Sequence, residues 1–425
     1  MTLDVSAPPE RAFLIGVETP GHGGWPVERS LAELGALAET AGATVVGSAS
    51  QRRRTPDPTW YFGKGRAAEL SDEKAATDFN LLVVDDELHP NQQRSLETLL
   101  GCKVLDRSAL IIDIFARHAQ SHEGRLQVEL AALEYHLPRL TRLWTHLSRT
   151  GGGIGTRGPG ESQLETDRRL IRERIKKLRA DLDAVRRHRG VAARRRERAE
   201  VAHVALVGYT NAGKSTLLNT LAEADLFTAD MLFATLDPTT RRVSLPSGQE
   251  IVVTDTVGFI NKLPHDLVDA FRATLEEVRR ADLLLEVVDA ADPDFVVQQA
   301  AVQTVLDELG AGETPRITIF NKMDRLAVEP DATLPGSERA VFVSALTGQG
   351  IPELLARVGD ALRGRMVPVR ATVPYARAEL VARARAAGDV TERYAADGIR
   401  IAGHLPAAMA AEVRAARVPA RRSTA

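Results

Sequence analysis

Residues 204–218 read VALVGYTNAGKSTLL. An apolar strand runs into a glycine-rich loop, which ends in Lys214 and Ser215 before a run of helix formers. This is the pattern GxxxxGK[ST] between a strand and a helix, in which backbone N–H groups surround a phosphate. The lysine supplies a cation for the β- and γ-phosphates, and the serine hydroxyl suits Mg²⁺. The stretch therefore predicts a doubly wound α/β domain with a P-loop.

The residues expected to bind the phosphates are Gly208, Tyr209, Thr210, Asn211, Ala212, Gly213, Lys214 and Ser215. A second loop follows a predicted strand at 250–254 and reads Asp255-Thr256-Val257-Gly258. There Asp255 is suited to hold the hydration shell of Mg²⁺, and the Gly258 N–H to reach the γ-phosphate.

Two later loops indicate which base is bound. The predicted strand 316–320 ends in Asn321-Lys322-Met323-Asp324, and strand 340–343 ends in Ser344-Ala345-Leu346. The Asp324 carboxylate only accepts hydrogen bonds, so it pairs with the two donors on the N1 and N2 edge of guanine, which adenine lacks. The stem of Lys322 is able to cover the base, and a backbone N–H of the last loop to meet guanine O6. GTP and GDP are the expected substrate and product.

Between these loops, the interval 233–240 occupies the place of a first switch segment, with candidate binding residues Phe233, Ala234, Thr235, Leu236 and Asp237. We expect Thr235 to be the second hydroxyl ligand of Mg²⁺, binding when the γ-phosphate is present. Thr239 and Thr240 are alternatives. The candidate catalytic set is thus Lys214, Thr235 and Gly258, and the candidate metal ligands are Ser215 and Thr235.

Composition excludes several classes of protein. The 425 residues suggest about three domains. Lys and Arg number 55 against 57 Asp and Glu, so a nucleic-acid partner must meet a local basic patch. The single Cys102 excludes an intrachain disulfide framework and a zinc-thiolate cluster. No apolar run approaches the length of a membrane span, and no secretory signal opens the chain, so we expect a cytoplasmic protein.

The chain before the P-loop predicts two parts. The first is a small α/β unit with strands at 12–17, 43–47, 81–84 and 103–105 and helices at 30–41 and 90–100. From Ser108 the pattern is helical, with one apolar stripe from Leu126 to Leu147 and a second from Ile171 to Val185. Two such stripes predict an antiparallel helical hairpin, in which Pro138 kinks or breaks the first helix.

Two features of the hairpin bear on partners. The stretch 150–160 reads TGGGIGTRGPG and is either a flexible connector or a loop that inserts into a partner, with Arg149 and Arg157 available for phosphates. Residues 165–200 hold fourteen Lys or Arg against seven Asp or Glu. Such a run is either a solvated helix face or an electrostatic footprint on RNA.

These motifs resemble the HflX family of translational GTPases. The resemblance is carried by GYTNAGKS, FATLDPTTR, DTVGF, NKMD and SAL, by YFGKG at 61–65, and by GGIGTRGPGESQLETDRR at 152–169. It covers about residues 10–365. Residues 366–425 read as a small βαβ-like unit with strands at 369–373 and 398–402 and a helix at 376–387. The expected domains are 1–106 (α/β), 107–199 (helical linker), 200–365 (GTP-binding) and 366–425 (C-terminal).

The resemblance implies a GTPase that binds the large ribosomal subunit, splits or rescues stalled ribosomes under stress, and is stimulated by the ribosome. It also allows ATP binding by the N-terminal unit. The simpler alternative is that this unit is a scaffold that binds ribosomal RNA through its surface. We expect a monomer off the ribosome. Two alternatives stay open: a GTP-dependent signalling switch acting on a protein partner, and a nucleotide-dependent RNA chaperone. An apolar groove would favour the former.

The residue after Gly258 is Phe259, where Ras-like enzymes place a water-orienting glutamine. A phenyl ring makes no such hydrogen bond, so we expect slow intrinsic hydrolysis. Asn211 stands where some related GTPases hold K⁺ beside the phosphates, which makes K⁺ a candidate cofactor in addition to Mg²⁺.

Overall fold

The computed structural model describes residues 9–20, 25–141, 159–198, 201–222, 232–233, 237–262, 272–326 and 340–417. The chain forms two compact units. The first comprises residues up to 185 together with 231–236 and 261–272, and the second comprises 186–230, 237–260 and 273–425. The positions 234–236 and the glycine-rich stretch 150–158 lie outside the described residues.

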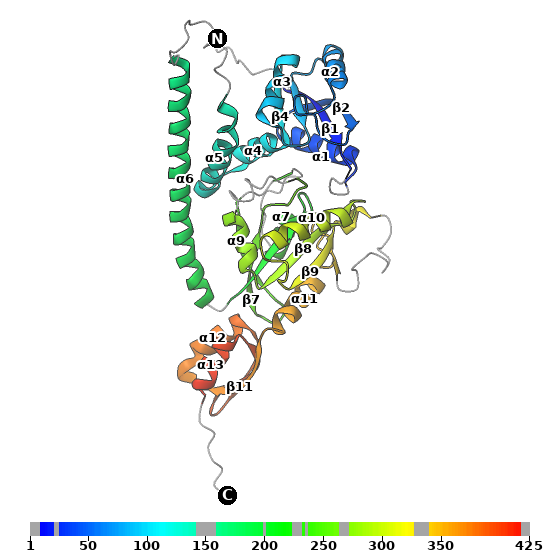
Figure 1. Ribbon diagram of the computed structural model, residues 1–425. Coiled ribbons are helices and arrows are strands. Elements are labelled where there is room, and N and C mark those ends of the chain that lie inside the picture. The colour runs from blue at the N-terminus through cyan, green and yellow to red at the C-terminus, as the bar shows by residue number, and fades with distance from the viewer. Residues whose placement is uncertain are drawn as a thin grey trace, which may run out of the picture. The chain divides into compact units, whose positions relative to one another are not determined.

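The first unit is built on a parallel sheet with the order β2-β1-β3-β4. Its elements are β1 (Arg11–Glu18), α1 (Val27–Thr40), β2 (Thr44–Arg52), α2 (Lys64–Thr77), β3 (Leu81–Val84), α3 (Pro90–Leu100), β4 (Lys103–Asp106), α4 (Arg107–His118) and α5 (His122–His136). Helices α1 and α4 contact each other, as do α2 and α3 (Figure 1). This α/β organisation agrees with the sequence-based prediction.

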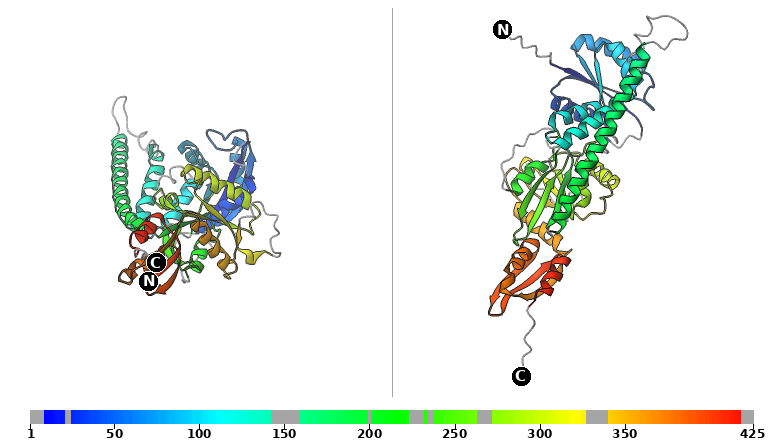
Figure 2. Two further views of the ribbon diagram at one scale, coloured as in Figure 1. Left: turned by 90° about the horizontal axis from the view of Figure 1, so that it is seen from below. Right: turned by 90° about the vertical axis from the view of Figure 1, so that its left-hand side faces the viewer.

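Helix α6 (Pro159–Arg198) is one unbroken element of 40 residues (Figure 2). Its apolar stripe packs on α5 through a buried cluster of leucine and isoleucine side chains, namely Leu126, Leu130, Ile175, Leu178 and Leu182. The two predicted stripes therefore do pack together. The first helix is shorter than its stripe predicts, because α5 ends at His136, just before Pro138. Proline lacks an N–H and disfavours helix in the residue before it.

The second unit contains a six-stranded sheet with the order β10-β9-β8-β5-β7-β6, parallel except for the β6–β7 pair. The strands are β5 (Ala202–Gly208), β6 (Thr239–Ser244), β7 (Glu250–Asp255), β8 (Leu283–Asp289), β9 (Arg316–Asn321) and β10 (Val341–Phe342). The helices are α7 (Lys214–Leu221), α9 (Arg272–Arg280), α10 (Phe295–Glu308) and α11 (Ile351–Arg363). This is the fold of a P-loop GTPase domain, with the carboxyl end of β5 near the middle of the sheet.

The last part of the chain differs from the predicted βαβ pattern. It is a three-stranded antiparallel sheet with the order β11-β13-β12. Its elements are β11 (Val367–Val373), α12 (Ala378–Ala387), β12 (Asp389–Ala395), β13 (Gly398–Leu405) and α13 (Ala407–Ala415). The sequence did not indicate β12, because this edge strand buries only Val390. Helices α12 and α13 complete a separate small core (Figure 2).

Candidate functional site

The P-loop turns sharply at two glycines at the end of β5. Gly208 has φ +149°, and a side chain there would meet the Val287 carbonyl at 2.2 Å. Gly213 has φ +92°, and its Cβ would lie 2.3 Å from the Asn321 amide nitrogen. Only glycine tolerates both this backbone and this closeness. The two glycines thereby set the loop that the sequence predicts for phosphate.

Lys214 begins α7 and is buried, with 6% of its surface exposed. Its Nζ donates hydrogen bonds to the carbonyls of Gly208 (3.2 Å) and Tyr209 (2.8 Å). Burial lowers the pKa of Lys214 to about 8; the Asp255 carboxylate opposes this shift and Lys322 adds to it. A desolvated ammonium with few compensating charges favours an anion, which a nucleotide phosphate supplies.

Ser215 and Asp255 stand together at the same end of the sheet. The Ser215 hydroxyl donates to Asp255 Oδ2 at 2.6 Å, and Asp255 is 1% exposed. A hydroxyl and a carboxylate side by side offer the oxygen ligands that Mg²⁺ prefers. These residues fit a magnesium ion bound with a nucleotide. Among the described residues, no group of three or more His, Cys, Asp or Glu forms a metal site by itself.

The DTVGF segment lies across the P-loop. The Phe259 N–H donates to the Gly208 carbonyl at 3.1 Å, and the Thr210 N–H donates to the Phe259 carbonyl at 2.8 Å. A Cβ on Gly258 would meet Thr210 Cα at 2.8 Å and Lys214 Nζ at 3.0 Å. The phenyl ring of Phe259 is buried at 2% exposure, so it does not point into solvent where an attacking water would lie.

The predicted base-binding loops are joined by Asn321. Its Nδ2 donates to the Ala212 carbonyl, and its Oδ1 accepts from the Ala345 N–H, each at 2.9 Å. The Ser344 hydroxyl donates to Asp324 Oδ1 at 2.5 Å, which aims the exposed carboxylate. The sequence placed these loops at one sheet edge but did not reveal that Asn321 ties them to the P-loop.

Lys322 shows a further contact that the sequence did not reveal. It adopts φ +64° and its Nζ lies 2.8 Å from Asp289 Oδ2, at the end of β8. The sequence feature that could have indicated this ion pair is the position of Asp289, at a strand end between the DTVGF and NKMD motifs. This ion pair fixes the lysine stem beside Asp324, as a cover for a planar base requires.

The remaining predicted residues divide as follows. Asn211 is exposed and adopts φ +59°. The Thr256 hydroxyl donates to the Leu206 carbonyl at 2.6 Å. Leu346 is 77% exposed. Phe233 belongs to the first unit, where its ring meets Phe115 edge to face with centroids 4.6 Å apart. Ala234, Thr235 and Leu236 lie outside the described residues, so the second predicted metal ligand stays a prediction. Val257 is buried and Met323 opens a short 3₁₀ turn.

Comparisons with known proteins agree with this geometry. Three family models match consecutive stretches: GTP-binding GTPase N-terminal at 28–116, GTP-binding GTPase Middle Region at 118–196, and 50S ribosome-binding GTPase at 203–322. The chain is 49% identical to the GTPase HflX of Caldanaerobacter subterraneus subsp. tengcongensis, over 86% of this chain and 84% of that one. It is 45% identical to that of Lacrimispora saccharolytica, over 95% of each, and 48% identical to that of Escherichia coli K12, over 79% and 80%. An identity this high over most of the chain, with a P-loop GTPase fold beneath it, means that this protein belongs to the HflX family of GTPases.

Proposed function

We propose that this GTPase works on the large ribosomal subunit. In the GTP form it binds the subunit and splits or rescues stalled ribosomes under stress, and the subunit in turn stimulates hydrolysis. The description of the family model over 203–322 as a ribosome-binding GTPase supports this proposal. The observation in this chain that carries it is the exposed basic face of α6.

That face is defined by Arg172, Lys176 and Lys177, all exposed. The side of α6 that packs on α5 is flanked by Arg174 and Arg179, which pair with Glu129 and Glu134 at 2.7 and 2.6 Å. Two arginines of the helix thus pair with α5, and three further cations of the same helix are exposed. Phosphate backbones are the natural partners of such a face, since they bind cations without reading sequence.

The chemistry assigned to the site follows from its oxygen and nitrogen groups. Ser215 would hold Mg²⁺ and Asp255 its hydration shell, with Thr235 as the proposed second hydroxyl ligand. Lys214 and the Gly258 N–H would position the terminal phosphate. When bound, Mg²⁺ neutralises charge on the β- and γ-oxygens. The buried Phe259 ring offers no hydrogen bond to water, so positioning of the nucleophile would fall to the ribosome, to the Thr235 backbone or to an ordered ion.

The test is GTP hydrolysis with and without purified large subunits, at low and at physiological salt. We expect strong stimulation that weakens as salt rises. Replacing Arg172, Lys176 and Lys177 together by Ala should reduce the dependence of log affinity on log salt by about 2 to 3. The control is the replacement of Arg370, Arg393 and Arg400 together by Ala. This removes three exposed charges from the C-terminal sheet.

Absence of stimulation, with GTP binding intact, would instead favour a signalling switch on a protein partner. RNA annealing or unwinding by the protein without ribosomes would favour the RNA-chaperone function. ATP binding by the N-terminal unit and a monomeric state off the ribosome stay predictions. No described helix is both long and apolar enough to cross a membrane.

We further propose that K⁺ assists hydrolysis through Asn211, whose exposed side chain stands in the P-loop with φ +59°. Hydrolysis should be faster in K⁺ than in Na⁺ at equal ionic strength, and Asn211→Ala should remove the difference. Equal rates in the two salts would end this proposal.

A further inference from the structure

A cavity of about 690 Å³ lies in the second unit, at the end of the sheet where β5 and β8 begin. Its lining includes Ala202 and His203 at the start of β5, and Asp282, the residue before β8. The P-loop follows the opposite end of β5, so this cavity is separate from the nucleotide site. Its volume lies within the range of cavities that hold small molecules.

The lining of this cavity carries an excess of positive charge. It holds four arginines and two carboxylates, namely Arg241, Arg242, Arg280, Arg365, Glu277 and Asp282. Both carboxylates already have partners, since Asp282 lies 3.3 Å from Arg365 and Glu277 lies 3.5 Å from His203 Nε2. The arginines therefore outnumber the carboxylates by two, which favours an anion with two negative charges.

Arg241 is the cation of this lining that lacks a partner. Arg242 lies 3.6 Å from Glu250, and Arg280 lies 2.5 Å from Glu276. Arg241 forms no hydrogen bond or ion pair with any residue that the structure describes, and its Nε is buried. Buried polar groups in folded proteins nearly always have a hydrogen-bond partner. This donor therefore has room for an acceptor that a ligand would supply.

The place of Arg241 in its strand explains why its surroundings are apolar. It closes the FATLDPTTR motif, lies on β6 opposite Val253, and precedes Val243 by two residues. Alternate residues of a strand share one face of a sheet, and so do residues directly opposite each other. Arg241 therefore shares the face on which Val243 and Val253 pack with Leu362 of α11. A half-buried guanidinium beside this core is partly removed from water, which strengthens its attraction for an anion.

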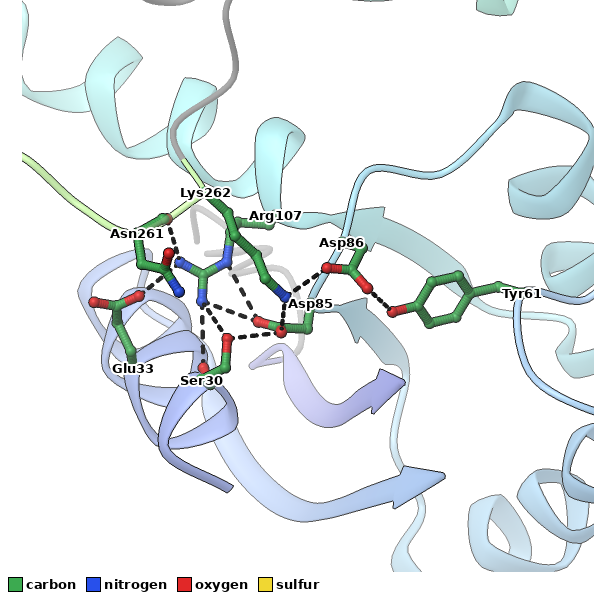
Figure 3. A network of polar contacts seen from close by, with 8 residues as sticks. All are labelled: Ser30, Glu33, Tyr61, Asp85, Asp86, Arg107, Asn261 and Lys262. Carbon is green, nitrogen blue, oxygen red and sulfur yellow. Dashed lines mark hydrogen bonds and ion pairs between the residues drawn. The ribbon is translucent and has the colours of Figure 1, made fainter. Parts of the chain in front are cut away.

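Buried cations in the first unit show how this chain satisfies such groups (Figure 3). Arg107, which is 1% exposed, lies 2.9 Å from Asp85 Oδ1. In the same cluster, the ammonium of Lys262 lies 2.6 Å from Asp85 Oδ2 and 2.5 Å from Asp86 Oδ1. Each of these two cations has a carboxylate partner within its own unit. Arg241 differs from both, because no described carboxylate pairs with its guanidinium.

We propose that this cavity binds a small organic phosphate ester, whose dianionic head pairs with Arg241 and whose apolar body packs on Leu362 and Met366. The planar guanidinium matches two oxygens of a phosphate group. Leu362 is 3% exposed and Met366 packs against the same core, so the cavity offers an apolar wall to the body of the ligand. This site is independent of the GTP site and of ribosome binding.

The test uses the full-length protein without ribosomes, with saturating GDP and Mg²⁺ to fill the P-loop. Isothermal titration calorimetry measures the binding of naphthyl phosphate, which has an aromatic body and a dianionic head. Inorganic phosphate lacks the body and naphthol lacks the charge, so each should bind at least about tenfold more weakly. No binding of naphthyl phosphate under these conditions overturns the proposal. Equally tight binding of naphthoate, which has a single negative charge, overturns the assignment of a phosphate head.

Substitutions in the lining locate the site. Arg241→Met should weaken naphthyl phosphate about tenfold or more, and Arg241→Lys, which keeps the charge without the planar group, should weaken it less. Met366→Glu, which adds a negative charge to the lining, should weaken it as well. Arg279→Met is the matched control, because Arg279 is exposed on α9 and does not line the cavity. Wild-type affinity in both Arg241→Met and Met366→Glu means that the ligand binds elsewhere, and overturns the proposal.

Stability without ligand separates binding from a purely structural role of Arg241. Removal of an unpaired, half-buried charge should leave the free energy of unfolding unchanged or raise it. Naphthyl phosphate should raise the midpoint of thermal unfolding of the wild-type protein, and should not raise that of Arg241→Met. A marked loss of stability in ligand-free Arg241→Met would show that the guanidinium holds the fold together, which contradicts the proposal.

Discussion

The side-chain amide of Asn321 donates a hydrogen bond of 2.9 Å to the Ala212 carbonyl, and so connects the NKMD loop to the P-loop. The same amide accepts from Ala345 on its other side. Three loops that are far apart in the sequence thus depend on one buried side chain, which is 1% exposed. A nucleotide would contact groups on all three.

Asn321→Ala should therefore weaken GDP and GTP alike, by about ten- to one-hundredfold, because it leaves a buried carbonyl and a buried N–H without partners. Asn321→Asp keeps the acceptor for Ala345 but loses the donor to Ala212, and we expect an intermediate effect. Titration with a fluorescent GDP measures both. An Asn321→Ala variant with wild-type affinity would show that the loops hold their positions without this bridge.

Asp324→Asn should reduce guanine selectivity. The amide presents a donor where the carboxylate only accepts, so the two donors of the guanine edge lose their shared partner. We expect GDP affinity to fall about thirtyfold or more while ADP affinity does not. Ser344→Ala, which removes only the hydroxyl 2.5 Å from the carboxylate, should cost less. Full discrimination against ADP in Asp324→Asn would mean that another group reads the base.

Lys214 makes stability depend on pH without nucleotide. Its pKa of about 8 lies below the ordinary value of 10.5, so the folded protein binds fewer protons than the unfolded chain between these values. The cost of the buried ammonium is fully present below pH 8 and is relieved as pH rises towards 10.5. Relative to Lys214→Met, the free energy of unfolding should rise by about 1 to 3 kcal/mol across this window. The same pH dependence of the free energy of unfolding in both proteins would contradict the lowered pKa of Lys214.

Arg107→Met should lower the free energy of unfolding of the first unit by about 3–5 kcal/mol, because it leaves the carboxylates of Asp85 and Glu33 without their buried cation. Urea denaturation monitored by circular dichroism measures the loss. Lys103→Met breaks an exposed pair and should cost at most about 1 kcal/mol. Equal effects of the two substitutions would contradict the importance of burial here.

Much of the second unit is predictable from sequence because each motif stands at the end of an apolar strand. Parallel strands bring their carboxyl ends to one edge, so Lys214, Asp255 and Asn321 had to converge. Helix α3 also begins and ends as predicted, at Pro90 and Leu100, since proline favours a first helical position. Local signals of this kind determine local structure.

What the sequence did not reveal depends on contacts between distant or weakly patterned residues. Helix α2 buries only Ala67 and Leu70, which is too few to give a helical stripe. The partners of Arg107 lie 74 and 154 positions away at Glu33 and Asn261, and no spacing rule links them. From sequence alone, an arginine directly after a strand is expected to be exposed to solvent. The folded structure instead buries Arg107.

The unbroken α6 has a mechanical consequence. At about 1.5 Å per residue its 40 residues form a rod about 60 Å long, from Pro159 to Arg198. A tilt of about 5° at one end of such a rod displaces the other by about 5 Å, roughly the pitch of one helical turn. The length of the helix therefore means that any change in the direction of its axis is largest, in ångströms, at the end farthest from the point of rotation.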